Sequence, residues 1–418
     1  MKIAVIGSGI AGLTAAWRLK DKHHVTLYER WGKLGMDAHT AEIDCDGVPL
    51  SINVPMRVFY PEYYPSLTEL YDELKVAYEP VQYSGSFSHF GGKTYFRYKN
   101  YWLGPYAVPF LSGQSTRSPA AIRLAAELIK LLRKSNLSKQ PSSLDDVSIE
   151  DYLRSEGYSP FFADNFLYPT FAGICTCSYE SVKRYPASII LDYLNSGLTW
   201  SKVNRLTHGT QDAASRLAAS AADVKLGMDL KAVTANENGV EVTDGEGHNA
   251  EFDHVVIATQ ANQALRLLPK ATAKENSALT KFGYEKSQVI VHQDASLAPS
   301  NPKDWAPVNF LMSDAHDKPM ATIVMNRIHP QLANKPSVFE TWNPFTEVQP
   351  NKVLLEASFE RPIVSQDSLR GIEQLDALHQ EPDRRIWFCG SYSKRGIPLL
   401  ESATASANNI ADKLNSLA

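Results

Sequence analysis

Apolar and polar residues follow one another in blocks over the first thirty positions. Four apolar residues, Ile3 to Ile6, form a run that is typical of a buried strand. The next segment places Leu13, Ala16 and Trp17 on one face at helical spacing, and a second apolar run covers residues 24–28. This order predicts a strand, a helix and a second strand, the repeating unit of a parallel α/β sheet.

Three glycines connect the first strand to the helix. Gly7, Gly9 and Gly12 have Gly-x-Gly-x-x-Gly spacing, in which the first permits a tight turn, the second lets a pyrophosphate approach the backbone and the third lets helix and strand pack closely. The helix N-terminus offers free N–H groups to the phosphates. Glu29, about 20 residues beyond the first glycine, lies where an acid accepts ribose hydroxyls. The context predicts a dinucleotide site.

The middle of the chain has a different pattern, with more helices and many aromatic residues. An amphipathic helix is expected over 61–76 and a β-hairpin over 81–98, turning at Gly91-Gly92. Further helices are predicted over 119–134, 148–157 and 161–172. Strand patterns return in 224–259, in 285–345 and in 385–390, and a last helix begins near Glu401.

Composition narrows the class of protein without fixing it. With 418 residues the chain is long enough for two domains, and 44% hydrophobic residues with 21% charged residues are typical of a globular protein. A net charge of −4 gives no reason to expect nucleic-acid binding. No secretory pattern precedes the first strand and no apolar run has membrane-spanning length, so the expected location is the cytoplasm.

These motifs resemble those of a known family. The run from Lys2 to Thr40 is similar to the N-terminus of flavin-dependent amine oxidases and their relatives, including phytoene desaturases. The segment 253–259 matches the family pattern Asp-x-Val-Val-x-Ala-Thr, and the strand ending at Gly390 resembles its last nucleotide-binding strand. Elements at 292–294, 325–326 and 343–344 are similar to an uncharacterised branch, of which one domain is also fused to plant cyclopropane fatty acid synthases.

The resemblance implies an α/β fold in which a Rossmann-like FAD-binding domain is interleaved with an α+β substrate domain. We expect the FAD-binding domain to comprise residues 1–80, 205–280 and 375–418, and the substrate domain residues 81–204 and 281–374. With one Gly-x-Gly-x-x-Gly motif, no second nucleotide domain for NAD(P)H is expected, and no metal-binding set of residues is evident.

The resemblance also implies non-covalent FAD, because neither cysteine nor histidine stands at the family's covalent-attachment position near Ser391-Tyr392. The sequence departs from the family at Gly35-Met36-Asp37, where relatives have Gly-Gly-Arg. His39 is either a cofactor neighbour or a structural histidine. The residues expected at the cofactor are Gly7, Gly9, Ile10, Ala11, Gly12, Glu29, Arg30, Gly35, Met36, Pro55, Met56, Arg57, Leu230, Ala258, Thr259, Gly390, Ser391, Glu401, Ser402 and Ala403.

The activity implied is an FAD-dependent oxidoreductase that transfers hydride from its substrate to flavin N5. Amine oxidases frame the substrate nitrogen with two aromatic rings, and Leu399 stands where one of those rings is expected. An aliphatic wall favours a chain, so a hydrophobic acyl-lipid substrate in contact with Leu399 is the leading prediction. The aromatic run 101–111 would line a chain tunnel, contact a membrane surface or pack as a buried loop.

Two other functions stay open, a true amine oxidase and a non-catalytic flavoprotein that acts as the partner of a lipid-modifying enzyme. The sequence does not fix the acid–base residues. Arg57 and Lys286 are the catalytic candidates, with a structural ion pair and a surface lysine as the respective alternatives.

Overall fold

Five short apolar strands form a parallel sheet in the order β11 (Asp223–Lys225), β2 (His24–Tyr28), β1 (Lys2–Ile6), β15 (His254–Ile257) and β21 (Ile386–Phe388). The computed structural model describes residues 1–37, 39–45, 47–137 and 141–417. Residues 3–6 are buried because both faces of β1 are covered. The predicted strand–helix–strand unit is confirmed.

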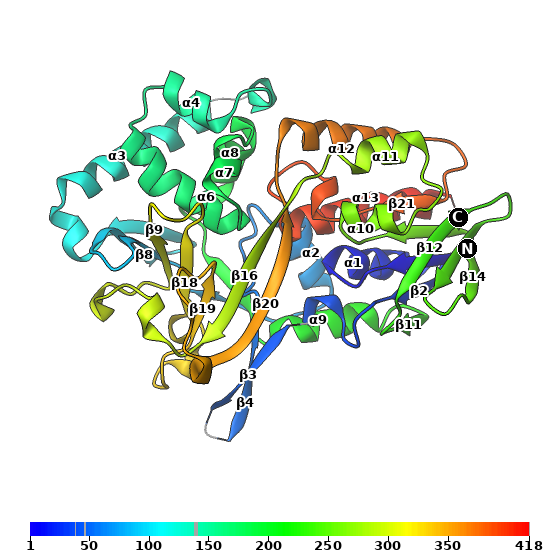
Figure 1. Cartoon of the computed structure of the whole chain (residues 1–418), viewed down its shortest axis with the longest axis horizontal. Helices are drawn as coiled ribbons and strands as arrows, with labels where there is room; N and C mark the ends of the chain where they lie inside the picture. Colours follow the sequence, from blue (N-terminus) through cyan, green and yellow to red (C-terminus); the bar gives the residue numbers. More distant parts are fainter. Residues whose placement is uncertain (38, 46, 138–140, 418) are drawn as a thin grey trace.

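Alternate residues of β1 enter different cores, as the two-residue period of a strand requires. Ile3 and Val5 belong to a large core that also contains residues of α1 (Ile10–Leu19), α9 (Gly209–Ala218) and α13 (Leu400–Ser416). Ala4 and Ile6 face a second core beneath the meander formed by β12 (Leu230–Ala235), β13 (Val240–Asp244) and β14 (Asn249–Phe252). Figure 1 shows α1 and α13 side by side next to this sheet.

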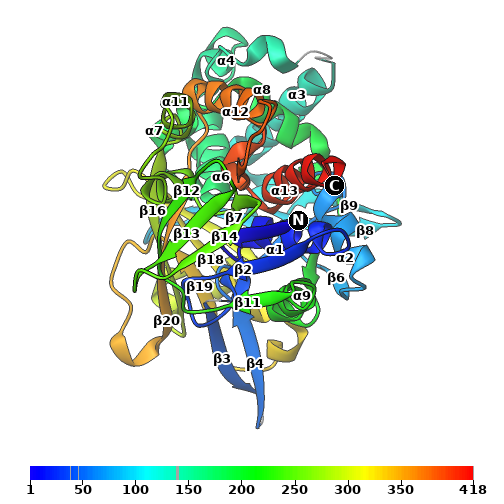
Figure 2. The ribbon, with the colours of Figure 1, turned by 90° about the vertical axis from the view of Figure 1, so that its right-hand side faces the viewer.

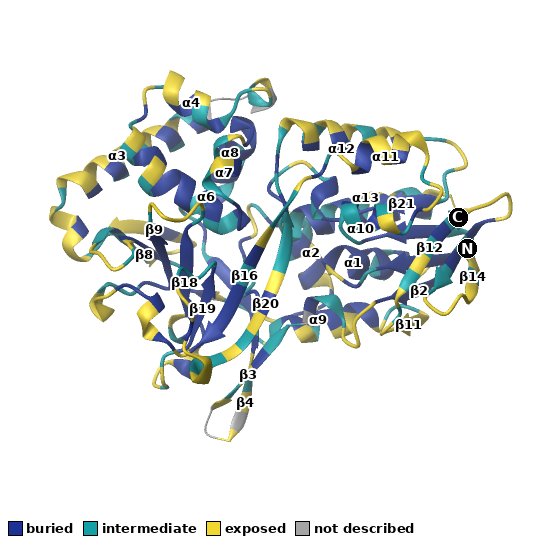
Figure 3. Ribbon diagram, in the orientation of Figure 1, coloured by how far each residue is buried: buried dark blue, intermediate teal, exposed yellow. Residues whose placement is uncertain are grey.

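A second sheet holds eight strands from two distant parts of the chain. Its order is β20 (Val353–Pro362), β16 (Tyr284–His292), β19 (Phe339–Trp342), β18 (Met320–Val324), β17 (Val308–Met312), β7 (Gly85–His89), β8 (Thr94–Leu103) and β9 (Tyr106–Leu111). Only the β17–β7 pair is parallel among the ladders described for this sheet. Figure 3 shows β18 and β19 almost wholly buried. The hairpin between β7 and β8 turns at Gly91, as predicted.

Helices lie above this second sheet and beside the first one (Figure 1). The predicted helix over 148–157 is shorter in the structure and begins after Ser148, whose Oγ accepts a hydrogen bond from the Asp151 N–H at 3.0 Å. The remaining helices are α2 (Pro65–Glu73), α3 (Pro119–Leu137), α4 (Ile149–Ser155), α5 (Pro160–Phe162), α6 (Tyr168–Cys175), α7 (Tyr179–Lys183), α8 (Ala187–Tyr193), α10 (Ala261–Arg266), α11 (Ala273–Leu279) and α12 (Gln366–Leu378).

The segments that connect the five-stranded sheet with the eight-stranded sheet form a small sheet of their own. A small antiparallel sheet joins β5 (Val58–Phe59), β10 (Val203–Leu206) and β6 (Tyr78–Val81), and the predicted boundaries at 80 and 205 fall inside β6 and β10. Because these boundaries lie inside strands of one sheet, the structure does not mark them as domain limits, and the division into two domains stays a prediction. The hairpin of β3 (Thr40–Cys45) and β4 (Val48–Asn53) projects from the body in both views (Figures 1 and 2). Among the described residues, no helix combines the length and hydrophobicity that a membrane span needs.

Candidate functional site

The glycine turn between β1 and α1 has the geometry that a dinucleotide requires. Gly7 has a φ of 101°, a left-handed conformation that favours glycine. A Cβ atom on Gly12 would lie 1.8 Å from the Gly7 carbonyl oxygen, so helix and strand pack too closely for any side chain. Gly9 is exposed, and a Cβ atom there would meet nothing within 4 Å. The backbone of Gly9 is therefore open to an approaching pyrophosphate.

Glu29 holds the neighbouring loop against this turn. Its buried carboxylate accepts hydrogen bonds from the Ser8 N–H at 2.9 Å and the Trp31 N–H at 3.0 Å. The Ser8 hydroxyl donates to Glu29 and accepts from the Gly35 N–H at 2.7 Å. Each carboxylate oxygen has two lone pairs, so Glu29 keeps acceptor capacity for ribose hydroxyls. Arg30 is exposed and lies over the Trp31 ring.

The later segments reach the same edge of the sheet because the carboxyl ends of parallel strands lie together. The Ala258 carbonyl oxygen would lie 3.1 Å from a Cβ on Gly7, and Thr259 is adjacent. After β21, the Gly390 N–H donates to Ser406 Oγ of α13 at 3.0 Å. We call this edge, with Gly7, Gly9, Gly12, Glu29 and Gly390, the glycine-rich edge. Ile10, Ala11, Ser391, Ser402 and Ala403 lie on the elements that bound it.

The side chain of Glu401 connects the start of α13 to another helix. Its carboxylate accepts hydrogen bonds from the Ser66 N–H at 3.2 Å and the Leu67 N–H at 3.0 Å, at the start of α2. The side chain therefore caps α2, and the expected position of Glu401 at the cofactor stays a prediction. Met36 is buried and its carbonyl accepts from Thr210 Oγ1 at 2.9 Å, whereas Leu230 opens β12 beside the second core.

A buried acid faces the segment that follows β4. Glu340, on β19, is 0% exposed, and its carboxylate accepts hydrogen bonds from the Met56 N–H at 3.0 Å and from Trp342 Nε1 at 3.1 Å. Burial raises the pKa of Glu340 to about 7, although these hydrogen bonds and the nearby Arg57 and Arg361 favour its ionised form.

Two arginines share this buried region. Burial lowers the pKa of Arg57, and burial together with Arg57 lowers the pKa of Arg361 to about 10. The Nε atom of each arginine is buried without a hydrogen-bond partner among the described residues. We call Arg57, Glu340, Trp342 and Arg361 the charged junction. Two cations beside one acid, with unpartnered donors, suit an anionic group such as that of a bound flavin or a carboxylate.

Tyrosines pack beside the loop that precedes α13. The ring centroids of Tyr63 and Tyr193 lie 4.4 Å apart with an interplanar angle of 73°, and Tyr60 and Tyr64 pack edge to face. The Tyr63 hydroxyl accepts from the Ile397 N–H at 3.0 Å, two residues before Leu399. We call Tyr60, Tyr63, Tyr64 and Tyr193 the tyrosine cluster. Its rings pack on one another and present no pair of parallel faces that would enclose a cation.

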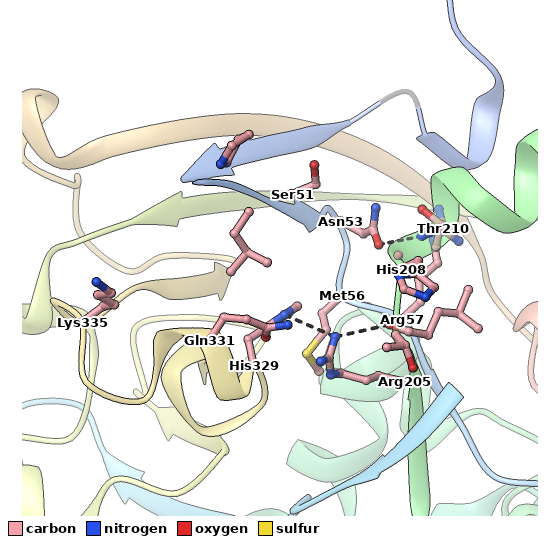
Figure 4. Close-up of a pocket in the computed structure, with 15 residues that line it drawn as sticks. Ser51, Asn53, Met56, Arg57, Arg205, His208, Thr210, His329, Gln331 and Lys335 are labelled. Carbon is pink, nitrogen blue, oxygen red and sulfur yellow. Dashed lines mark hydrogen bonds between the residues drawn. The ribbon is translucent and has the colours of Figure 1, made fainter. Parts of the chain in front are cut away.

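A cavity of about 490 Å³ opens beside the charged junction (Figure 4). Met56 and Arg57 line one side of it, and the others come from β4, from the end of β10 with the start of α9, and from residues 329–335. The expected neighbours of the flavin ring therefore lie between this cavity and the eight-stranded sheet.

Solvent exposure bears on two expectations for the substrate region. Lys286 is exposed on β16, which agrees with the surface-lysine alternative, and a catalytic role for Lys286 stays a prediction. In the run 101–111, Tyr101, Leu103, Tyr106 and Phe110 are 50–56% exposed on the β8–β9 hairpin and do not line a buried tunnel. The contact with a membrane surface stays a prediction.

Glu340, Arg361 and the tyrosine cluster were missed by the sequence reasoning. One signal was available, because Phe339–Trp342 is an apolar strand interrupted by an acid, and an acid buried in a strand needs a partner. His292 and Asn326, which belong to the elements similar to the uncharacterised branch, make hydrogen bonds within the sheet and its turns.

Comparisons with known proteins agree with this geometry. Residues 10–296 match the family described as flavin containing amine oxidoreductase. A structure of putrescine oxidase bound to putrescine is similar, with a TM-score of 0.69, 15% identity and coverage of 100% of this chain and 99% of that chain. A CLA-producing fatty acid isomerase from P. acnes has a TM-score of 0.69, 15% identity and 98% coverage of both chains.

A third similar structure is a putative protoporphyrinogen oxidase from Exiguobacterium sp. 255-15, with a TM-score of 0.68, 15% identity and coverage of 100% of this chain and 99% of that chain. No curated protein matches the sequence. At these identities the structural likeness shows the fold.

Proposed function

The chain belongs to the flavin containing amine oxidoreductase family, and we propose that this oxidoreductase acts on an acyl lipid with an anionic head group rather than on an amine. The family establishes a flavin cofactor, and we propose that it is FAD held non-covalently at the glycine-rich edge. Bound FAD would supply the ring that accepts hydride, while the protein binds and orients the substrate and excludes water.

The charge of the junction is the observation that carries this proposal. Arg57 and Arg361 are half-buried, with buried Nε atoms, beside a single acid, Glu340, whose pKa of about 7 leaves it partly protonated near neutral pH. A substrate ammonium group would enter a region that already holds two half-buried cations, and the repulsion between like charges there is unfavourable. A carboxylate or phosphate would instead meet donors that have no partner.

Two further observations support a hydrophobic chain. Leu399 is a partly buried aliphatic residue two positions after Ile397, whose N–H bonds to Tyr63 of the tyrosine cluster, so an aliphatic and not an aromatic side chain stands at this point of the loop. Burying a chain in such a region contributes about 0.8 kcal/mol per CH₂ group. Among the similar structures, the fatty acid isomerase is a protein whose name fits this substrate class.

The chain's own residues have defined roles in this proposal. Arg57 would hold the negative charge of the substrate, Arg361 adds positive charge beside it, and both carboxylate oxygens of Glu340 accept from the Met56 N–H and fix that backbone. Because its pKa lies near neutral pH, Glu340 is also a buried group able to take up or release a proton during catalysis.

Anaerobic mixing of the FAD-loaded protein with candidate substrates tests the proposal. Bleaching of the flavin by an unsaturated or methylated acyl lipid is the expected result. Bleaching by amines alone would favour the amine oxidase alternative. If neither class bleaches a fully loaded flavin, the protein is a non-catalytic partner of a lipid-modifying enzyme. A colourless preparation that does not take up added FAD would contradict the cofactor assignment itself.

A further inference from the structure

The cavity beside the charged junction has an unusual composition. Fifteen described residues line it, and none of them is aspartate or glutamate, whereas five are arginine, histidine or lysine. The basic residues are Arg57, Arg205, His208, His329 and Lys335. We call this space the basic cavity.

The floor of the basic cavity contains buried, polar side chains. Arg205 is 5% exposed and His329 is 8% exposed, whereas Ser51, His208 and Gln331 at the cavity wall are exposed. One Nη atom of Arg205 pairs with Glu79, and the other donates to the Leu206 carbonyl at 3.3 Å. The Arg205 Nε atom is buried without a partner among the described residues. An unpartnered, buried guanidinium N–H on a residue that lines a cavity needs a physical explanation, and a bound anion would supply one.

The contact between Arg205 and His329 fixes which ring nitrogen can donate. Arg205 Nη1 lies 3.4 Å from His329 Nδ1, and Figure 4 draws this contact at the cavity. Arginine only donates hydrogen bonds, so Nδ1 must accept and the ring proton must lie on Nε2. Burial, with the nearby Arg205, lowers the pKa of His329 to about 4, which agrees with a neutral ring. His329 thus adds an N–H donor to the arginine donors.

We propose that the basic cavity binds the anionic head group of the substrate, a carboxylate or a phosphate, through Arg205, His329 and Arg57. This inference rests on the proposed function, because it identifies the end of the acyl lipid that the protein holds. Arg57 lines the cavity and belongs to the charged junction, so a head group bound there would lie next to the residues expected at the flavin.

Isothermal titration of the FAD-loaded protein with four probes tests this assignment. The probes are dodecanoate, dodecyl phosphate, dodecanol and inorganic phosphate. Arg205→Gln removes the buried cation, and Arg384→Gln is a matched control because Arg384 forms a buried pair with Glu275 at 2.9 Å outside the cavity. We expect Arg205→Gln to weaken the binding of dodecanoate, of dodecyl phosphate or of both about 10- to 100-fold. This is the change in affinity that corresponds to the loss of a hydrogen bond to a charged group. Binding of dodecanol, and all binding by Arg384→Gln, should stay unchanged.

Equal affinity of the wild-type protein and Arg205→Gln for the anionic amphiphiles would overturn the inference. It would also be overturned if Arg205→Gln lowered the affinity for dodecanol as much as the affinity for the anionic amphiphiles. Inorganic phosphate that binds as tightly as dodecyl phosphate would show a site for a free anion, which also overturns the head-group assignment. Which amphiphile binds more tightly identifies the head group as carboxylate or phosphate.

A second variant decides the matter if Arg205→Gln does not fold. Gln331 is exposed at the cavity, so the isosteric Gln331→Glu change places a negative charge there without disturbing the core. Gln331→Glu should lower the affinity for the anionic amphiphiles several-fold and leave the affinity for dodecanol unchanged. If the wild-type protein and Gln331→Glu bound the anionic amphiphiles equally, the inference would be overturned. Flavin bleaching is scored separately. Charge-dependent binding without bleaching by any acyl lipid would sink the proposed function alone, and bleaching with charge-independent binding would sink this inference alone.

Discussion

The glycine-rich edge and the charged junction are built from different parts of the polypeptide. At the glycine-rich edge the functional surface is backbone, because Gly9 is open and Gly12 allows contact with Gly7. At the charged junction the functional groups are side chains, with Met56 bonded to Glu340 across 284 positions of sequence. An added side chain at the glycine-rich edge would block either the cofactor or the packing of α1 on β1. The charged junction instead depends on the balance of charge among its side chains. The two regions should therefore fail in different ways.

Gly12→Val is expected to have the largest effect on stability, because it disrupts the packing of the fold itself. The new Cβ would lie 1.8 Å from the Gly7 carbonyl oxygen, so α1 cannot keep its place on β1. We expect a loss of more than about 4 kcal/mol in the free energy of unfolding, at the upper end for single substitutions. Thermal unfolding of the apoprotein measures it, and a wild-type midpoint would refute the packing role of Gly12.

Gly9→Trp should abolish FAD binding and spare the fold, which separates the two glycines. No atom lies within 4 Å of a Cβ at this position and the backbone φ is −65°, so the apoprotein should change by less than about 0.5 kcal/mol. The indole would occupy the expected path of the pyrophosphate. Gel filtration after reconstitution with FAD measures retention, and a yellow protein peak would place the cofactor elsewhere.

Glu340→Gln tests the charged junction through pH. The folded protein keeps a proton on Glu340 up to its pKa of about 7, while the unfolded chain releases it near the ordinary value of 4.5. The unfolded state therefore binds fewer protons in this window, so stability falls as pH rises, by about 3 kcal/mol in all. The variant lacks this slope. Unfolding of both apoproteins between about pH 5 and pH 8 checks it, and parallel profiles would mean that Glu340 ionises normally.

The β8–β9 hairpin provides the smallest expected effect and lies in a region that neither site uses. Trp102 and Leu103 are 40% and 56% exposed, and Lys202 lies over the Trp102 ring. If the hairpin contacts a membrane, Trp102→Ser with Leu103→Ser should weaken binding to vesicles of anionic phospholipid about tenfold, with stability unchanged. Co-sedimentation measures binding, and equal binding by both proteins would remove the membrane contact from the account.

The same difference decides what the sequence could predict. The roles of Gly7, Gly9 and Gly12 follow from their spacing and from the strand and helix beside them, so the turn and its sheet could be predicted. That the strands β15 and β21 return to this sheet followed from the family resemblance, whereas their order in the sheet did not. Glu340 and Arg361 could not be placed beside Arg57, because no local pattern reports which strands of the second sheet face the segment after β4. The sequence pattern also left open whether the side chains of Lys286 and of the β8–β9 hairpin are exposed to solvent.

The charged junction should select an anionic chain over a cationic one. The most direct test compares oleate with oleylamine, which share a chain and differ in the sign of the head group, in anaerobic mixing with the FAD-loaded protein. We expect oleate to bleach the flavin at least about tenfold faster, a difference of about 1.4 kcal/mol in activation free energy, and Arg57→Gln to reduce this preference. Faster bleaching by oleylamine in the wild-type protein would contradict it.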